Sequence, residues 1–307
     1  MPEIEYGQST TEESVSLWRE AISFYAARPF AVIKVLLPPA VIAYLAALIC
    51  QHEIELIRAR VIASGFRVFT WHDVGAYELL MLPMQLWLIL KQWFLWICYC
   101  FAIIGICNFV RDYSVEEDRS SIGVFSTIRD RPVRFLSSAT LFFGVLVLAF
   151  AGMMFILTGI VEIQQRAHIP YAGAWENWVS TLGAIALISA VLVRWAFAVP
   201  VAVLKDLPFS AAMRLSDQLT NHRMLQLWAL AMESEVAGYF ALIAPSYVLF
   251  YLHLPLTPFN YYCGEAAAIL LSAVSQTPLM LAIAIVLARH TPESEPMHSS
   301  ANRKWTA

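Results

Sequence analysis

Apolar residues form six long runs along this chain, and polar stretches separate them. A transmembrane helix needs about 20 consecutive residues that are mostly apolar, and each run reaches that length. We therefore predict six membrane-spanning helices. Their approximate bounds are residues 30–50, 82–110, 135–161, 178–204, 224–252 and 265–288. The second run is longer than the hydrocarbon layer requires, so we expect it to tilt or to protrude.

Three shorter segments precede the first, third and fifth spans and carry apolar residues at near-helical spacing. Their approximate bounds are residues 12–28, 120–131 and 208–222. We predict amphipathic helices that lie along the membrane surface. Each surface helix with the hairpin that follows it forms one of three weakly similar units, which indicates an internal repeat. The alternative interpretation is that any helix entering a membrane from a basic loop has this pattern.

The composition supports a membrane protein, because 59% of the 307 residues are hydrophobic and only 14% are charged. Soluble domains carry about a quarter charged residues. The fold class is therefore all-α, a polytopic integral membrane protein with a single membrane domain over residues 1–307. We expect a disordered polar tail from about residue 290 to 307. The acidic, polar start predicts no cleaved signal peptide, and the net charge of -3 argues against a nucleic-acid partner.

The distribution of basic residues predicts the orientation. Most of the 20 lysine and arginine residues fall in the segments that share a side with the N-terminus. Cytoplasmic loops are enriched in these residues, so we predict that both termini are cytoplasmic.

Three ionisable residues fall inside predicted spans, where a charge is costly unless it is paired or hydrated. On straight helices, Arg194 lies about 16 Å from the inner end of span four, and Glu233 and Glu235 lie about 15–18 Å into span five. This shared level predicts an ion pair between Arg194 and one glutamate. Residues two apart on a helix point roughly 200° apart, so only one glutamate can face Arg194. The pair either locks two helices together or belongs to a proton or substrate site.

Two further polar positions are candidates within the spans. Lys91 lies near the outer end of span two, where a lysine can extend its ammonium group to water. Gln276 lies in a polar stretch of span six that also holds Ser272, Ser275 and Thr277 and precedes Pro278. This stretch predicts a kink with interhelical hydrogen bonds, or alternatively part of a substrate path.

Arginines at the predicted inner membrane surface are candidates for binding anionic phospholipid headgroups. They are Arg28, Arg129, Arg131, Arg134, Arg214 and Arg223. The predicted partners are the lipid bilayer and these headgroups, together with a second membrane protein or a second copy of the chain.

The sequence predicts no cofactor, no metal site and no catalytic residue. The five cysteines form no C-x-x-C pair. The loop after span one carries His52, Glu53, Glu55, His72 and Asp73 but lacks an H-E-x-x-H pattern. A disulfide between Cys50 and Cys263 remains an alternative, because both lie near the predicted outer face.

One stretch after span four resembles a known family. Its matching residues are Pro200, Ala212, Arg214, Ser216, Leu219 and Arg223, with Trp18, Ala21 and Arg28 in the N-terminal segment. The chain resembles the membrane domain of glycerophosphoryl diester phosphodiesterases. The resemblance implies a six-span bacterial protein of the cytoplasmic (inner) membrane. The chain departs from the family at Lys205, where an acidic residue is usual and Asp206 is adjacent, and at Asn221-His222, where a glycine turn is common. No phosphodiesterase domain follows the last span, so we do not expect that activity.

Two main hypotheses follow for function. The first is a non-enzymatic scaffold or accessory subunit that binds lipid or another membrane protein. The alternative is a small-molecule or proton-coupled transporter or channel with a polar midplane at Arg194, Glu233 and Glu235. A membrane-embedded enzyme is a third reading, and the chain lacks a paired His or Asp constellation for it. A water-accessible cavity that reaches Arg194 would favour transport, whereas a packed midplane would favour the scaffold.

Overall fold

The computed structural model describes residues 12–63, 71–113, 125–166, 183, 186, 189–221, 223–252 and 257–290. Throughout these residues the regular structure is helical. The helices are α1 (Glu12–Ala27), α2 (Pro29–Ala63), α3 (Trp71–Tyr113), α4 (Ser126–Asp130), α5 (Pro132–Arg166), α7 (Ala198–Leu204), α8 (Phe209–Asn221), α9 (Met224–Tyr251), α10 (Pro258–Ser275) and α11 (Thr277–Arg289). The predicted disordered tail, apart from His290, lies outside the described residues, as do the first residues of the predicted second surface helix.

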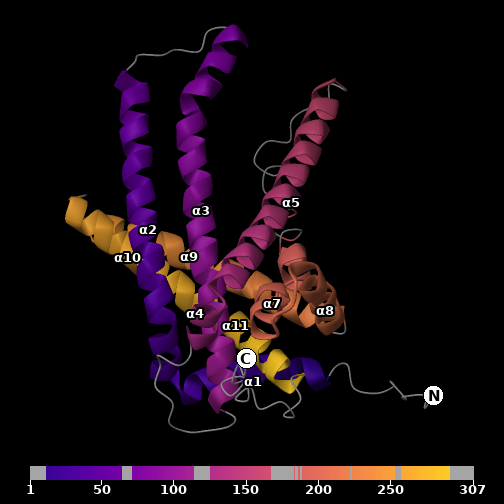
Figure 1. The fold of residues 1–307 in the computed structure, drawn as a ribbon. Helices are drawn as coiled ribbons and strands as arrows, with labels where there is room; N and C mark the ends of the chain where they lie inside the picture. The colour runs from indigo at the N-terminus through magenta and orange to yellow at the C-terminus, as the bar shows by residue number, and fades with distance from the viewer. Residues whose placement is uncertain are drawn as a thin grey trace, which may run out of the picture.

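Three long helices, α2, α3 and α5, rise from a common base (Figure 1). The short helices α1, α4, α7 and α8 gather at that base with α11, while α9 and α10 run across the direction of the long helices in this view. Helix α1 packs against α11, and Arg289 near the end of α11 forms an ion pair with Glu20 of α1. The described ends of the chain therefore lie together.

Among the residues that the structure describes, five helices are long and apolar enough to cross a membrane, which supports a multi-pass membrane protein. They cover Pro29–Ala63, Met81–Arg111, Pro132–Met153, Met224–Pro245 and Cys263–Arg289. These ranges correspond to the predicted spans one, two, three, five and six. The predicted fourth span differs, because its described part is a shorter apolar helix over Ser189–Leu204. A turn at residues 195–197 interrupts that helix, so the prediction of one continuous helix is wrong there.

The core is centred on α11. Every residue from Met280 to Leu287 is buried, and the helix packs against α1, α3 and α9. A helix that is apolar on all sides is typical of a fully enclosed position. A second cluster joins α3, α4, α5 and α7 around Ile104, Phe135 and Phe142. Helix α11, the C-terminal half of predicted span six, thus holds the base together.

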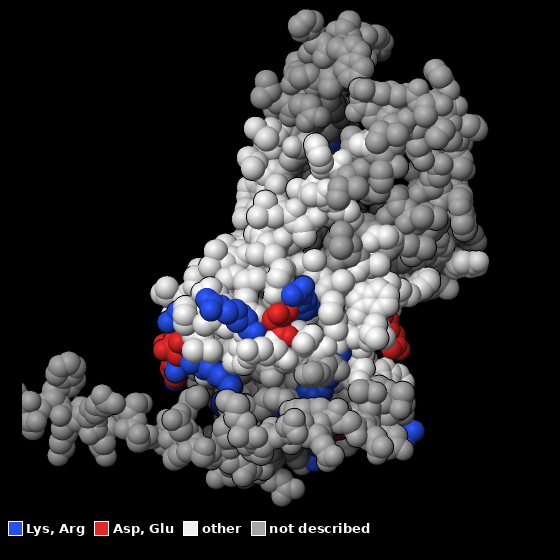
Figure 2. Space-filling view, turned by 90° about the vertical axis from the view of Figure 1, so that its right-hand side faces the viewer, with Lys and Arg blue, Asp and Glu red and all other residues white. Residues whose placement is uncertain are grey.

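The outer faces of the long helices are apolar and exposed. Leu45 and Ile49 of α2, Leu86 of α3, and Leu148 and Phe155 of α5 are examples. On the face that Figure 2 shows, nearly all the charged side chains lie in the lower half, and the described surface above them is uncharged apart from one small basic patch. Water-soluble monomers rarely expose continuous apolar surface on this scale, so these faces fit contact with lipid.

Gly105 of α3 lies in a tightly packed part of the base. A Cβ at this position would lie 2.6 Å from Phe125 and 3.0 Å from Val35. Phe125 is itself stacked on Phe101, with ring centroids 4.5 Å apart, so its ring has little room to move. We expect Gly105→Ala to lower the free energy of unfolding by about 1 kcal/mol through overpacking. Unfolding by SDS in mixed micelles measures this change.

Gly144 supplies the matched control for this prediction. Nothing lies within 4 Å of the Cβ that Gly144→Ala would add. Alanine is the better helix former, so this variant is expected to match or exceed the wild-type stability. Equal stability changes in the two variants would contradict the close packing at Gly105.

Candidate functional site

The break in the fourth apolar helix is held by side chains of α8. A helix that ends inside a protein leaves carbonyl and N–H groups without helical partners. Ser216 Oγ accepts a hydrogen bond from Phe197 N at 3.2 Å and donates one to Arg194 O, also at 3.2 Å. Thr220 Oγ1 lies 3.1 Å from the same carbonyl oxygen. The hydroxyl groups of α8 thus replace the helical bonds that the turn removes.

The side chain of Arg194 also turns toward α8. Its Nε lies 2.7 Å from Asp217 Oδ1, and its guanidinium carbon lies 5.9 Å from the centroid of the Trp195 ring. The predicted ion pair between Arg194 and a glutamate is therefore wrong. The depth of Arg194 was estimated on a straight helix, whereas the turn at residues 195–197 redirects the chain toward α8.

The two glutamates of α9 point in different directions, as helical geometry predicts. Glu233 Oε2 accepts a hydrogen bond from Trp18 Nε1 at 3.1 Å. Glu235 lines a cavity, together with Ala231 one helical turn before it. Glu233 therefore joins α9 to α1 at the base. Because α9 runs across the long helices (Figure 1), distance along the chain does not give depth here.

Small side chains allow α8 to approach the break closely. Ala212, Ser216 and Thr220 follow each other at intervals of four residues and are almost completely buried. Residues four apart share one face of a helix. The family resemblance included Ala212 and Ser216 without a structural role for either. The four-residue spacing of Ala212 and Ser216 could have predicted that Thr220 lies on the same buried face. No sequence pattern indicated that Asp217 would bind Arg194.

Helix α7 ends in a Schellman motif. Leu207 N donates to Ala202 O at 3.1 Å, and Asp206 adopts a φ of 54° at the position where glycine is usual. Two arginines hold this end. Arg131 donates from one terminal nitrogen to Val203 O at 2.8 Å, and Arg134 Nε lies 3.2 Å from Asp206 Oδ1. Asp206 therefore makes the acidic contact at this turn, while Lys205 is exposed.

The other predicted headgroup arginines lie at or near the surface. Arg129 is exposed, with Asp130 at 3.7 Å, and Arg214 is exposed on α8. Arg28 is partly buried and lies over the Phe24 ring at 5.3 Å, and Arg223 is partly buried at the start of α9. Lipid binding by these residues stays a prediction.

Lys91 contacts the neighbouring span. Its Nζ donates to Gln51 Oε1 at 3.1 Å, and Gln51 Nε2 donates to Glu55 Oε1 at 3.0 Å. This chain of hydrogen bonds joins α3 to the half of α2 that lies farther from the base. Lys91 therefore links α3 to α2. This role is separate from the predicted extension of its ammonium group to water, which stays a prediction.

The polar stretch of span six is a second helix break, as predicted. Helix α10 ends at Ser275, and α11 begins at Thr277, with Gln276 at its N-cap position but without a side-chain capping bond. Ser275 Oγ donates to Ser272 O at 2.7 Å, and Thr277 Oγ1 donates to Ala273 O at 3.2 Å. Hydroxyl groups thus satisfy backbone carbonyls beside this break as well.

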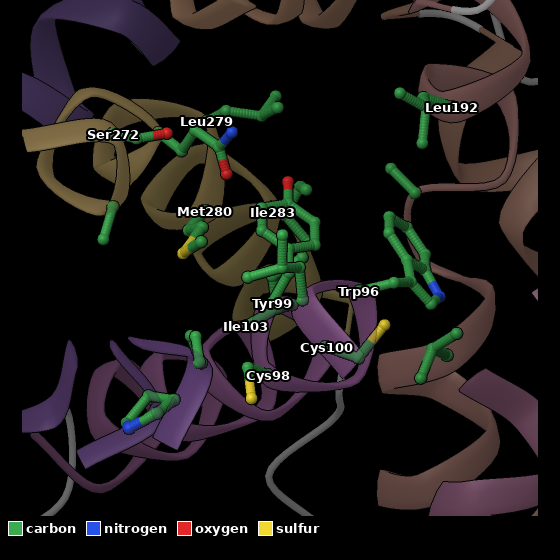
Figure 3. A pocket seen from close by; sticks show the side chains of 18 of the residues that line it. Trp96, Cys98, Tyr99, Cys100, Ile103, Leu192, Ser272, Leu279, Met280 and Ile283 are labelled. Atoms are coloured by element: carbon green, nitrogen blue, oxygen red, sulfur yellow. The ribbon is translucent and has the colours of Figure 1, made fainter. Parts of the chain in front are cut away.

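A cavity of about 450 Å³ lies between the two interrupted helices. Figure 3 shows Ser272 and Leu279 on one side of the open space and Leu192 on the other, with Trp96 and Tyr99 of α3 below them. The polar side chains on its wall include Gln92, Tyr99, Glu235, Ser272 and Gln276. Arg194 and Glu233 are not among the lining residues. Of the predicted polar midplane, only Glu235 therefore lines the cavity, and Gln276 of span six lines it as well.

Cysteines and metal-binding residues form no site in the described part of the chain. Among those residues, no three His, Cys, Asp or Glu side chains lie together in a group that could hold a metal ion. Cys50 is buried, Cys263 is exposed, and both are free thiols, so the alternative of a disulfide between them is not realised.

Comparison with known proteins finds a match over part of the chain. Residues 173–288 match the sequence profile of the membrane domain of glycerophosphoryl diester phosphodiesterase. This part of the chain resembles that membrane domain. The match includes both helix breaks, α8 and Glu235, whereas α1 to α5, with Arg131 and Tyr99, lie outside it. No curated protein and no solved structure matches the chain.

Proposed function

We propose that the protein is a non-enzymatic accessory subunit or scaffold of a bacterial cytoplasmic membrane and that it binds lipid. In this proposal the chain crosses the membrane six times, both termini are cytoplasmic, and α1, α4 and α8 lie at the inner surface. The charged band at the base and the apolar faces above it support this orientation (Figure 2). The short helices before α2, α5 and α9 support the three-unit repeat.

The observation that carries the proposal is the cavity. Its wall is mostly apolar, with a small number of polar groups, and it lies among helices suited to the membrane. Sites for small ligands typically have volumes of about 300–1,000 Å³ and this kind of wall. Lipids are the most abundant molecules with matching chemistry in a membrane.

Extraction from its own membrane in polymer discs, followed by mass spectrometry, tests the proposal. The expected result is stoichiometric enrichment of one lipid class or of one second membrane protein relative to the surrounding membrane. Protein that carries only bulk lipid in bulk proportions, with no second protein, would contradict it.

A transporter is the second candidate, because two interrupted helices border the same cavity. Discontinuous helices form the substrate sites of many secondary transporters. Proton or solute flux in liposomes is the measurement for this candidate. Flux that Glu235→Gln abolishes and Glu233→Gln leaves intact would favour transport over the accessory role.

A further inference from the structure

We propose that the cavity binds a single-chain amphiphile whose polar end donates hydrogen bonds and carries no negative charge. This inference rests on the proposed function and specifies the chemical class of the ligand.

The apolar walls can accommodate one hydrocarbon chain. Trp96, Cys100 and Ile103 line the cavity from α3 at helical spacing, and Leu279 and Ile283 line it from α11. Leu192 lies across the open space from Leu279 (Figure 3). Burial of a methylene group is favourable by about 0.8 kcal/mol when the reference state is water. A chain inside a membrane gains less, so the polar end must supply the preference for this cavity.

The charge of the cavity wall determines which polar end group of a ligand is favoured. Glu235 is the acidic residue in the lining, and no Lys, Arg or His side chain is found there among the described residues. Arg194, two residues after the lining residue Leu192, forms an ion pair with Asp217 and does not line the cavity. A carboxylate or phosphate in this space would face Glu235 without a counter-charge, which is unfavourable at low dielectric constant. An ammonium group would pair with Glu235, and a hydroxyl group could donate to it.

The polar groups on the wall also lack internal partners. The side chains of Gln92, Tyr99, Glu235 and Gln276 make no hydrogen bond to another side chain or to the backbone within the described residues. Tyr99 and Gln276 are partly buried, whereas Gln92 and Glu235 are exposed toward the open side of the cavity. In a membrane, polar groups next to apolar surface are costly unless they are hydrogen-bonded. A ligand with donor groups would satisfy Glu235 and the amide oxygens at one end of the cavity.

Native mass spectrometry of the full-length protein in phosphatidylcholine nanodiscs tests this inference. Three amphiphiles with the same chain are compared: dodecylammonium, monododecanoylglycerol and dodecanoate. We expect the first two to bind at least about tenfold more tightly than dodecanoate. Glu235→Gln should abolish the preference for dodecylammonium over dodecanoate. Glu233→Gln is the matched control and should retain it, because Glu233 bonds Trp18 outside the cavity.

Cavity-filling variants separate the two proposals. Ala273→Phe should block all three amphiphiles, and Leu192→Trp should do the same from the opposite wall if the first variant does not fold. Equal binding of the three amphiphiles, or a preference that Glu235→Gln leaves unchanged, would overturn the ligand class. If a cavity-filling variant still blocks binding in that case, the lipid-binding function stands. Binding that neither filling variant alters would overturn both.

Discussion

Replacing Ser216 with leucine is expected to lower the free energy of unfolding by about 3 kcal/mol or more. Ser216 is fully buried against the break in the fourth apolar helix. Leucine removes the hydroxyl that serves Phe197 N and Arg194 O, and it adds volume where α8 packs closely. Unfolding by SDS in mixed micelles measures the change. Ser216→Ala should give a smaller loss, because it removes the hydrogen bonds without adding volume.

The control for this prediction is Ser210→Leu, which makes the same change on the exposed side of the same helix. It is expected to unfold like the wild type. Similar losses from the two leucine variants would show that α8 does not support the helix break.

Replacing Arg131 with methionine is expected to cost about 2 kcal/mol, because hydrogen bonds from a charged group contribute more than neutral ones. Methionine keeps most of the side-chain length but leaves the carbonyls of Val203 and Leu204 without this donor. The end of α7 and its attachment to α5 are then weakened. The same SDS titration measures the loss.

Arg129→Met is the matched control, two residues earlier in the chain. The Arg129 side chain is 82% exposed, so its removal is expected to leave the stability unchanged. A lipid-headgroup role shared by both arginines predicts the opposite pattern, in which both variants lose binding to anionic vesicles equally and neither loses stability. That result would contradict the structural role of Arg131.

The spans were predictable because hydropathy depends only on local composition. The two helix breaks were not equally predictable from hydropathy. Pro278 and the polar residues around Gln276 indicated the second break, whereas the turn at residues 195–197 consists of Trp, Ala and Phe. Hydropathy is therefore continuous across the first break. The groups that stabilise it, Ser216 and Thr220, lie about one helix later in the chain.

The candidate site was predictable only in part, for a related reason. The opposite directions of Glu233 and Glu235 follow from helical geometry alone, and the structure confirms them. The partner of Arg194 depended on depth, which cannot be calculated along helices that bend or cross. Tyr99 lies within an apolar run, and no polar pattern around it in the sequence distinguishes it, although it lines the cavity together with Glu235.

The most direct test of lipid binding in the cavity is a high-resolution structure of the protein extracted from its membrane in polymer discs. The account predicts elongated density between Leu192 and Leu279, with its polar end at Glu235 and Gln276. A cavity closed by side chains, or one that contains only water, would contradict it.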